Sequence, residues 1–242
     1  MATARESPPA PATPPATTAA TPPRVIRIPA ATVLRGVSYD EYVRLRADRG
    51  NAHLRMTFHD GTLKLMSPEF IHEVPSHRLG IFVTILAGEL EIPCTGAAST
   101  TFRRRGDRPG GGHGREADQS FYLAHADRLV GKQGIDLDAG DPPPDLWVEV
   151  DNRASSRGRL PVYAALGVPE VWRYHARKET LRFDRLVGGG YEPIERSLAL
   201  PMLTPALVLD ALALGRSRFD SAWYRDLKAW IGAKFGPPAP PA

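Results

Sequence analysis

The sequence predicts an α/β fold, a mixed β-sheet flanked by helices. Apolar residues recur at helical spacing from about 71 to 90, and two short strand patterns flank a turn signal at 59–61. A further pattern, at 146–151, is a nearly continuous apolar run of the kind that is buried on both faces of a central strand. Because helical patterns come before, between and after the strand patterns, the core is expected to be α/β or α+β.

The composition sets limits on the class of protein. With 242 residues the chain can form one substantial domain, and its 42% hydrophobic and 24% charged residues are ordinary for a globular protein. The formal net charge of +4 is compatible with a polyanionic partner but does not require one. Cys94 is the single cysteine, which excludes an intramolecular disulfide and a cysteine-based zinc site. We see no secretory signal and no apolar run of about 18 residues, so we expect a cytoplasmic protein without a membrane span.

The two ends of the chain differ in composition from the rest. Residues 1–23 are almost entirely Ala, Pro and Thr, and residues 236–242 read Gly-Pro-Pro-Ala-Pro-Pro-Ala. Such segments bury too little apolar surface to offset the entropy of the chain. We therefore expect disordered ends on either side of one domain at 24–235.

Local signals justify the individual elements. Ser38, with Glu41 three residues later, is typical of a capping box and predicts a helix to about Ala47. His59-Asp60-Gly61 is a hairpin signal between two strand patterns. Pro75 is tolerated within the first turn of a helix, so the long helix begins no earlier than about residue 71. The strands are expected at 54–58, 62–66, 98–103, 117–123, 146–151, 170–175, 181–186 and 191–196. The helices are expected at 38–47, 71–90, 157–166, 204–214 and 219–235.

Two acids lie inside the apolar run. Glu149 and Asp151 are two residues apart, so on a strand their side chains project from the same face. Burying two like charges side by side is costly unless a cation or a hydrogen-bond network receives them, and a metal ion is the best candidate. Asp118 lies on the preceding strand pattern, and oxygen ligands from these acids would suit Mg²⁺ or Mn²⁺ rather than zinc. Taken singly, each acid is more often exposed or salt-bridged, and that alternative stays open.

Several motifs together carry a resemblance to a known family. In chain order they are Gly61-x-x-x-x-Met66-Ser67-Pro68, His72-Glu73, Glu116-x-Asp118-x-x-Phe121-Tyr122, Pro143-Pro144-Asp145-Leu146-x-Val148-Glu149-Val150-Asp151, Ser155-Ser156 and Tyr163-Ala-x-Leu-Gly-Val-Pro-Glu-Val-Trp-Arg173. Over roughly residues 33–235 the chain resembles the Uma-type restriction endonucleases of bacteria, which are members of the PD-(D/E)XK nuclease superfamily. The resemblance implies a restriction-endonuclease-like core and an endonuclease that hydrolyses DNA phosphodiester bonds with Mg²⁺ or Mn²⁺.

The resemblance also assigns roles to individual residues. Asp118 matches the aspartate of the motif and Glu149 matches its second acidic position, so both would hold the divalent ion. Glu73 matches an upstream acid that some members add to the site, with His72 beside it. Such an ion would act as a Lewis acid on the phosphodiester and lower the pKa of a bound water.

The chain departs from the family motif at two positions. Ala117 stands where the motif has proline, which is a minor change in turn geometry. Asp151 stands where the motif has lysine, two residues after Glu149. Arg159, on the following helix, is a candidate replacement, similar to lysine migration elsewhere in the superfamily. Arginine can hold phosphate, but its pKa above about 12 makes it a poor proton acceptor.

Arginines also gather in the glycine-rich stretch at 103–115, which is expected to be a loop between two strands. Its candidate nucleic-acid contacts are Arg103, Arg104, Arg105 and Arg115. Along a nucleic-acid backbone such residues would make salt-sensitive phosphate contacts. A solvated connection is an equally good interpretation. The spacing matches neither a Walker motif nor a dinucleotide fingerprint.

Three classes of function remain open. The leading hypothesis is a metal-dependent endonuclease acting on DNA, and a homodimer is compatible with it because cutting both strands is simplest with two sites. The second is a non-catalytic, nucleic-acid-binding descendant of such a nuclease, motivated by Asp151. The third is an assembly protein whose carboxylate cluster is a structural relic. Serine hydrolase chemistry is disfavoured because Gly-x-Ser-x-Gly is missing from the sequence.

Overall fold

The computed structural model describes four segments of the chain, residues 31–66, 70–152, 156–216 and 218–236. The predicted tails at 1–23 and 236–242 lie outside these segments apart from Gly236, as do Ser67-Pro68 and Ser155. The proposed single domain at 24–235 stays a prediction. In the part of the chain that is described, no helix is both long enough and apolar enough for a membrane span.

The strands of the described segments form two sheets. They are β1 (Ala31–Arg35), β2 (Arg55–His59), β3 (Thr62–Met66), β4 (Thr95–Gly96), β5 (Thr101–Arg105), β6 (Gly112–Glu116), β7 (Gln119–Tyr122), β8 (Leu146–Asp151), β9 (Glu170–His175), β10 (Thr180–Val187) and β11 (Gly190–Ile194). One sheet has the strand order β1-β3-β2-β6-β5 and its pairs are antiparallel. The other has the order β11-β10-β9-β8-β7-β4 and is mixed, because β8 and β9 run parallel.

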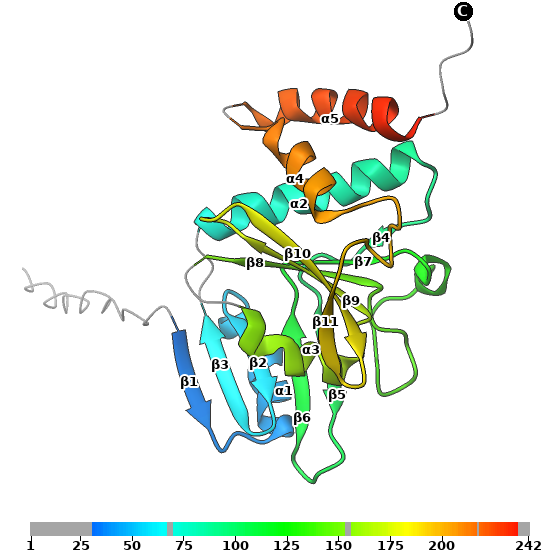
Figure 1. Ribbon diagram of the computed structural model, residues 1–242. Coiled ribbons are helices and arrows are strands. Elements are labelled where there is room, and N and C mark those ends of the chain that lie inside the picture. Colours follow the sequence, from blue (N-terminus) through cyan, green and yellow to red (C-terminus); the bar gives the residue numbers. More distant parts are fainter. Residues whose placement is uncertain (1–30, 67–69, 153–155, 217, 237–242) are drawn as a thin grey trace, which may run out of the picture.

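Helices cover these sheets on several sides. The α-helices are α1 (Tyr39–Ala47), α2 (Phe70–Glu89), α3 (Leu160–Leu166), α4 (Pro205–Ala213) and α5 (Asp220–Phe235), and the 3₁₀ helices are η1 (Arg49–Asn51), η2 (Ala126–Leu129) and η3 (Ser156–Arg159). Figure 1 shows α2, α4 and α5 together above the six-stranded sheet, with α3 below it. The predicted α/β class, with a mixed sheet flanked by helices, is confirmed.

Strand β8 lies between two apolar clusters, which explains its continuous apolar sequence. Val148 and Val150 pack into the cluster shared with α2, α4 and α5, whereas Trp147 packs into the cluster shared with α3. All six residues of the strand are buried. Because side chains alternate along a strand, Glu149 and Asp151 project from the face of Trp147, toward the side of the sheet that α3 covers.

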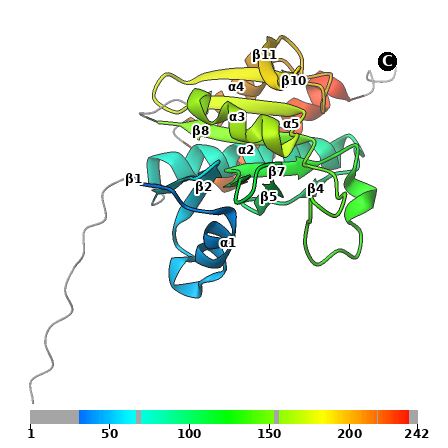
Figure 2. The ribbon, with the colours of Figure 1, turned by 90° about the horizontal axis from the view of Figure 1, so that it is seen from below.

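Helix α1 packs on the five-stranded sheet from the side opposite to α3 (Figure 2). Tyr42 of this helix stacks on Phe58 with ring centroids 5.0 Å apart. A Cβ atom added at Gly114 would come within 2.4 Å of the Tyr42 ring, and one at Gly112 within 2.3 Å of the Tyr39 ring. These glycines of β6 therefore let the helix approach the sheet closely.

Most of the predicted elements are confirmed, but the loop expected at 103–115 is wrong. That stretch contains the end of β5 and most of β6, which pair as an antiparallel hairpin. Gly112 and Gly114 follow from the close packing of α1, whereas Gly106, Gly110 and Gly111 lie in the turn between the two strands. Strand β1 was not predicted. The capping box is confirmed, since the Glu41 amide donates to Ser38 Oγ and the Ser38 amide donates to Glu41 Oε2 at 2.7 Å.

Candidate active site

The buried acid of β8 has four hydrogen-bond donors around its carboxylate. Glu149 is fully buried, and its Oε1 accepts from Trp147 Nε1 at 2.7 Å and from Arg115 Nε at 3.2 Å. Its Oε2 accepts from Arg115 Nη2 at 2.7 Å and from Arg159 Nη2 at 3.0 Å. A carboxylate offers about four lone-pair positions, so these donors occupy all of them.

The charge of Glu149 is stabilised by this arrangement. Burial alone would raise the pKa of the carboxyl group, because a low-dielectric surrounding disfavours the charged form. The guanidinium groups of Arg115 and Arg159 outweigh burial and lower the pKa to about 2. The carboxyl group is therefore ionised at neutral pH.

The second acid of the strand shares one of these arginines. Arg159 Nη2 also lies 3.2 Å from Asp151 Oδ1, and Asp151 Oδ2 accepts from Ser156 Oγ at 2.9 Å. Glu149 and Asp151 thus face the same way, as their spacing indicates, and the positive charge between them is a guanidinium group. Helix η3 supplies this charge because it directly precedes α3 on that face of the sheet.

Asp118 lies just before β7 and contacts the backbone of β8. Its Oδ2 accepts from the Val150 amide at 2.7 Å, so the side chain takes the place of a backbone acceptor where β7 begins. His72 Nε2 lies 2.8 Å from the same oxygen, and Arg55 Nη1 donates to Oδ1. Asp118 is buried and already surrounded by donors.

Glu73 lies at the outer edge of this second group of contacts, with its side chain 43% exposed. Its Oε1 is 3.3 Å from Arg55 Nη2 and 3.0 Å from His72 Nδ1. Arg55 and His72 each bridge Glu73 and Asp118. Burial would lower the pKa of His72, but hydrogen bonds to Asp118 and Glu73 outweigh it and the pKa is raised.

Protein donors hold the predicted ligands, so a shared Mg²⁺ ion would have to displace some of these donors. Glu149 has no free lone pair, and guanidinium groups hold both Glu149 and Asp118. Within the described segments, the group of three potential ligand atoms that lie close enough for a common ion is formed by His59, Asp60 and His113, outside the predicted set. The metal-binding role of Asp118, Glu149 and Glu73 stays a prediction.

The candidate nucleic-acid contacts are not equivalent. Arg103 and Arg105 are exposed on β5, and Arg105 lies over the ring of Tyr39 with 4.8 Å between its guanidinium carbon and the ring centroid. Arg104 is half-buried and its Nη1 donates to the Ala165 carbonyl at 3.3 Å. Arg115, on β6, is buried and pairs with Glu149 of β8, so it does not lie on an exposed loop.

Two basic residues of the site were missed by the sequence analysis. Arg55, at the start of β2, links Asp118 to Glu73. Lys64, on β3, is half-buried, and burial followed by the charges of Arg159 and Arg115 lowers its pKa. The alternation of residues at 62–66 indicates only that the Lys64 side chain lies on the face opposite to the two leucines. The pairing of Lys64 with Thr57 on β2, which the local sequence does not reveal, places it near the arginines.

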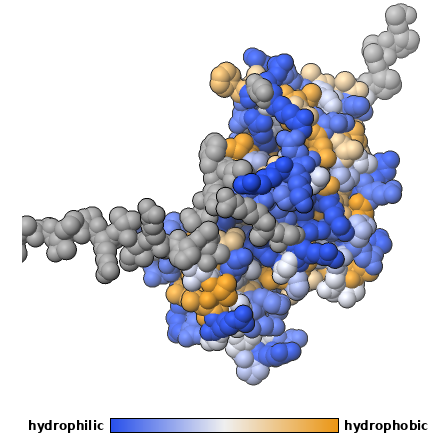
Figure 3. All heavy atoms as spheres, turned by 60° about the vertical axis from the view of Figure 1, so that its left-hand side comes forward, coloured by the Kyte–Doolittle hydropathy of each residue, from blue (hydrophilic) through white to orange (hydrophobic). Residues whose placement is uncertain are grey.

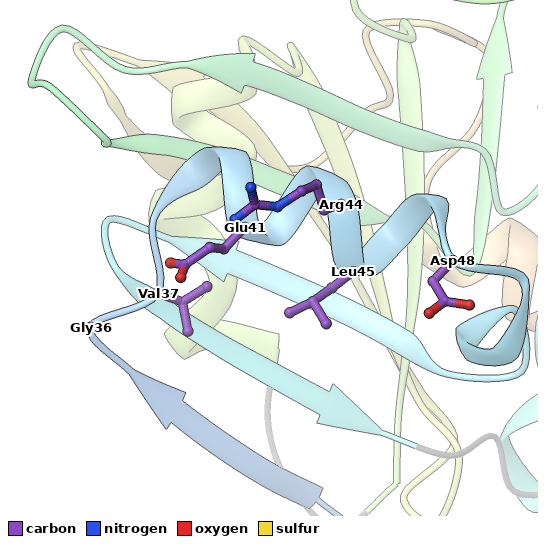
Figure 4. A pocket seen from close by; sticks show the side chains of 6 residues that line it. All are labelled: Gly36, Val37, Glu41, Arg44, Leu45 and Asp48. Atoms are coloured by element: carbon purple, nitrogen blue, oxygen red, sulfur yellow. The ribbon is translucent and has the colours of Figure 1, made fainter.

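A hollow lies elsewhere on the surface, beside α1. It has a volume of about 400 Å³ and is lined by Gly36, Val37, Glu41, Arg44, Leu45 and Asp48. Figure 4 shows these side chains along the outer side of α1 and the segment before it. None of the predicted site residues lines this hollow, so the site is the network of buried acids and arginines and not this cavity.

Comparison with known proteins agrees with the motif series. No curated protein matches the chain significantly. A family model does match it, over residues 39–216, which is more than half of the chain and includes each of the predicted site residues. That family is described as "Putative restriction endonuclease". The chain therefore belongs to the Uma2 family of putative restriction endonucleases.

Proposed function

We propose that the chain is an endonuclease that hydrolyses DNA phosphodiester bonds, with Mg²⁺ or Mn²⁺ as its cofactor. Family membership supports the class of reaction. The observation that carries the proposal is that two groups of ion pairs adjoin strand β8. One lies around Glu149, Asp151 and Arg159, and the other lies around Asp118 and Glu73, with Asp118 accepting from the Val150 amide. A network of this kind is costly to bury and is typical of a functional site.

The chain's own residues offer several groups to a DNA phosphate. Arg159 has a guanidinium group whose donors suit a phosphate oxygen, and it is the proposed replacement for the motif lysine. Lys64 is the nearby primary amine, half-buried against the same charges. A divalent ion would polarise the phosphodiester when bound. Glu149 could join such an ion only if Arg115 or Arg159 released it, because its lone pairs are occupied.

A plasmid assay tests the proposal. Supercoiled plasmid incubated with the protein should be nicked or linearised in Mg²⁺ or Mn²⁺ and remain intact in EDTA. Asp118→Asn should abolish cleavage, and Glu192→Gln, an exposed acid on β11, serves as a matched control. Cleavage by Asp118→Asn at the wild-type rate would mean that another site does the chemistry. Thermal unfolding of each variant separates loss of activity from loss of fold.

A second function is DNA binding without cleavage. Two observations favour it, namely Asp151 at the lysine position and the four donors that occupy the Glu149 carboxylate. Figure 3 shows hydrophilic residues over much of the middle of one face of the molecule, which suits a polar ligand. For a labelled duplex in EDTA, the logarithm of the association constant should fall linearly with the logarithm of the salt concentration. Binding with no cleavage in any divalent ion would favour this function over the first.

Assembly and location belong to the same proposal. A homodimer would provide one site for each DNA strand, and cutting both strands is simplest with two sites. Sedimentation of the protein with and without duplex DNA measures this. Activity on DNA in a bacterial cell also implies a cytoplasmic protein.

A further inference from the structure

A second group of potential ligands lies at the far end of the five-stranded sheet. His59 ends β2, and His113 lies opposite it on β6 in the antiparallel register. Asp60 follows directly in the β2–β3 turn. These three residues come from two separate parts of the chain and meet at one corner of the sheet. The proposed nuclease site does not use them.

The ligand atoms of this group are close together. His59 Nδ1 and His113 Nδ1 are 2.9 Å apart, and one ligand atom from each of the three residues lies within 4.8 Å of the other two. Asp60 is exposed, and its Oδ1 accepts from the Gly112 amide at 3.3 Å, which leaves its second oxygen for another partner. Two imidazole nitrogens and one carboxylate oxygen thus lie close together, and the contact between the two Nδ1 atoms is at a hydrogen-bond distance, which a bound ion would replace.

The backbone holds these residues in place. The Asp60 amide donates to the Gly112 carbonyl at 3.1 Å, so the turn is tied directly to β6. Asp60 and Gly61 have φ values of 37° and 84°, the left-handed pair that a tight hairpin turn requires. Phe58, next to His59, is buried against Tyr42. A site formed by residues fixed in this way would need little rearrangement to take an ion.

This set of ligands selects a particular class of ion. Imidazole nitrogen combined with one carboxylate is typical of Zn²⁺ and its neighbours Co²⁺ and Ni²⁺, whereas Mg²⁺ prefers oxygen ligands. With Zn–N bonds of about 2.0–2.1 Å, two nitrogens at a tetrahedral angle are roughly 3.3 Å apart. The observed separation of 2.9 Å therefore requires a shift of only a few tenths of an ångström.

We propose that His59, Asp60 and His113 bind one Zn²⁺-class ion, with a fourth position open to water. The site is separate from the proposed nuclease site. Arg55 and His59 are the two ends of β2, and four residues of strand span about 13 Å. The bound ion would link the β2–β3 turn to β6, so its expected effect is on stability and not on the acids around Asp118.

Metal titration of the untagged full chain tests this inference. Cobalt absorption spectra and zinc calorimetry should show one saturable ion per chain, and zinc should raise the melting temperature. His59→Gln and His113→Gln should each weaken binding by at least about tenfold. Asp60→Asn keeps an oxygen for the Gly112 amide and tolerates the left-handed turn, so it removes the charge with little change in the fold. His53→Gln, at an exposed histidine outside the group, is the matched control.

Two results would overturn the inference. One is the absence of saturable binding of Zn²⁺, Co²⁺ or Ni²⁺ by the wild-type chain. The other is equal affinity for the wild type and both His59→Gln and His113→Gln, provided that the variants melt like the wild type without metal. Loss of plasmid cleavage has no bearing on either result, so this inference and the proposed nuclease activity fail independently.

Discussion

Two buried glutamates on neighbouring strands each have a tryptophan two positions away in the sequence, but their pKa values shift in opposite directions. Glu149 on β8 accepts a hydrogen bond from Trp147 Nε1, and Glu170 on β9 accepts one from Trp172 Nε1, each at 2.7 Å and each two residues away. Both acids are fully buried. Strands β8 and β9 are parallel neighbours, and their register places Val148 beside Trp172, so the two Trp–Glu pairs lie on opposite faces of the sheet.

Their other partners differ in charge. Glu149 is held by Arg115 and Arg159, and its pKa is lowered to about 2. The other donors to Glu170 are neutral and include the Ser197 hydroxyl at 3.1 Å and the Ala199 amide at 2.8 Å. Burial is then the larger effect, and the pKa of Glu170 is raised.

The difference shows how to separate a site from a structural contact in this sheet. Glu170 faces the apolar cluster of α2, α4 and α5 and fastens a loop near Ser197, a role for which neutral donors are sufficient. Glu149 faces the opposite side, where charges from β6 and η3 converge. Remote arginines, and not the Trp–Glu spacing, mark the candidate site.

The largest expected effect comes from removing the charge of Glu149. Glu149→Gln leaves Arg115 buried without its anion, and breaking a buried pair in this way costs about 3–5 kcal/mol in free energy of unfolding. Urea unfolding at pH 7 measures it. A double variant with Arg115→Met should recover part of the loss, because both charges are then removed. A loss below about 1 kcal/mol in the single variant would contradict the buried pair.

Next in size is the effect of Arg159 on the proposed cleavage. Arg159→Ala should lower the rate by roughly 10²-fold, the size expected for losing one donor to developing charge, whereas Arg159→Lys should preserve or raise it. Initial rates of plasmid nicking under saturating Mg²⁺ or Mn²⁺ measure both. Equal rates for Arg159→Ala and the wild type would remove Arg159 from the chemistry.

How far the sequence predicts this fold depends on whether the signal is local. The capping box at Ser38 and the hairpin at His59-Asp60-Gly61 depend on residues a few positions apart, and both are confirmed. Strand β1 has no such signal, since it is a short edge strand whose Val33 is 52% exposed. The glycines of β6 give a loop signal in the sequence because their partners, Tyr39 and Tyr42, lie about 70 residues earlier in the chain.

The same limit applies to the candidate site. Strand periodicity predicts that Glu149 and Asp151 share a face and that a cation should receive them. It does not say which cation, because Arg115 reaches Glu149 only through the packing of two sheets. Arg159 was a candidate because of family resemblance and does lie between the two acids. Arg55 carries no local signal that would have found it.

Glu170→Gln should cost less than Glu149→Gln. The amide of Gln keeps one acceptor oxygen, but its NH₂ group faces donors from Ser197 and Ala199, so about 1–3 kcal/mol is expected for unsatisfied polar groups. No buried charge is left without its counter-ion. Urea unfolding beside Glu149→Gln gives the ranking directly. A larger loss for Glu170→Gln would mean that the neutral cluster matters more to the fold than the charged one.

The smallest effect is a difference in pH dependence, and its sign distinguishes the two acids. For Glu149 the folded pKa lies below the unfolded value of 4.5, so its stabilisation is present above pH 4.5 and is lost as the pH falls toward 2. For Glu170 the folded pKa lies above 4.5, so its stabilisation is present below pH 4.5 and is lost as the pH rises. The loss caused by Glu149→Gln should therefore grow with pH and that caused by Glu170→Gln should shrink, neither by more than about 1.4 kcal/mol per pH unit. Urea unfolding of each variant beside the wild type, from acidic to neutral pH, measures how the loss in free energy of unfolding changes with pH. Changes of the same sign for both variants would mean that the neighbouring groups do not shift the two pKa values in opposite directions.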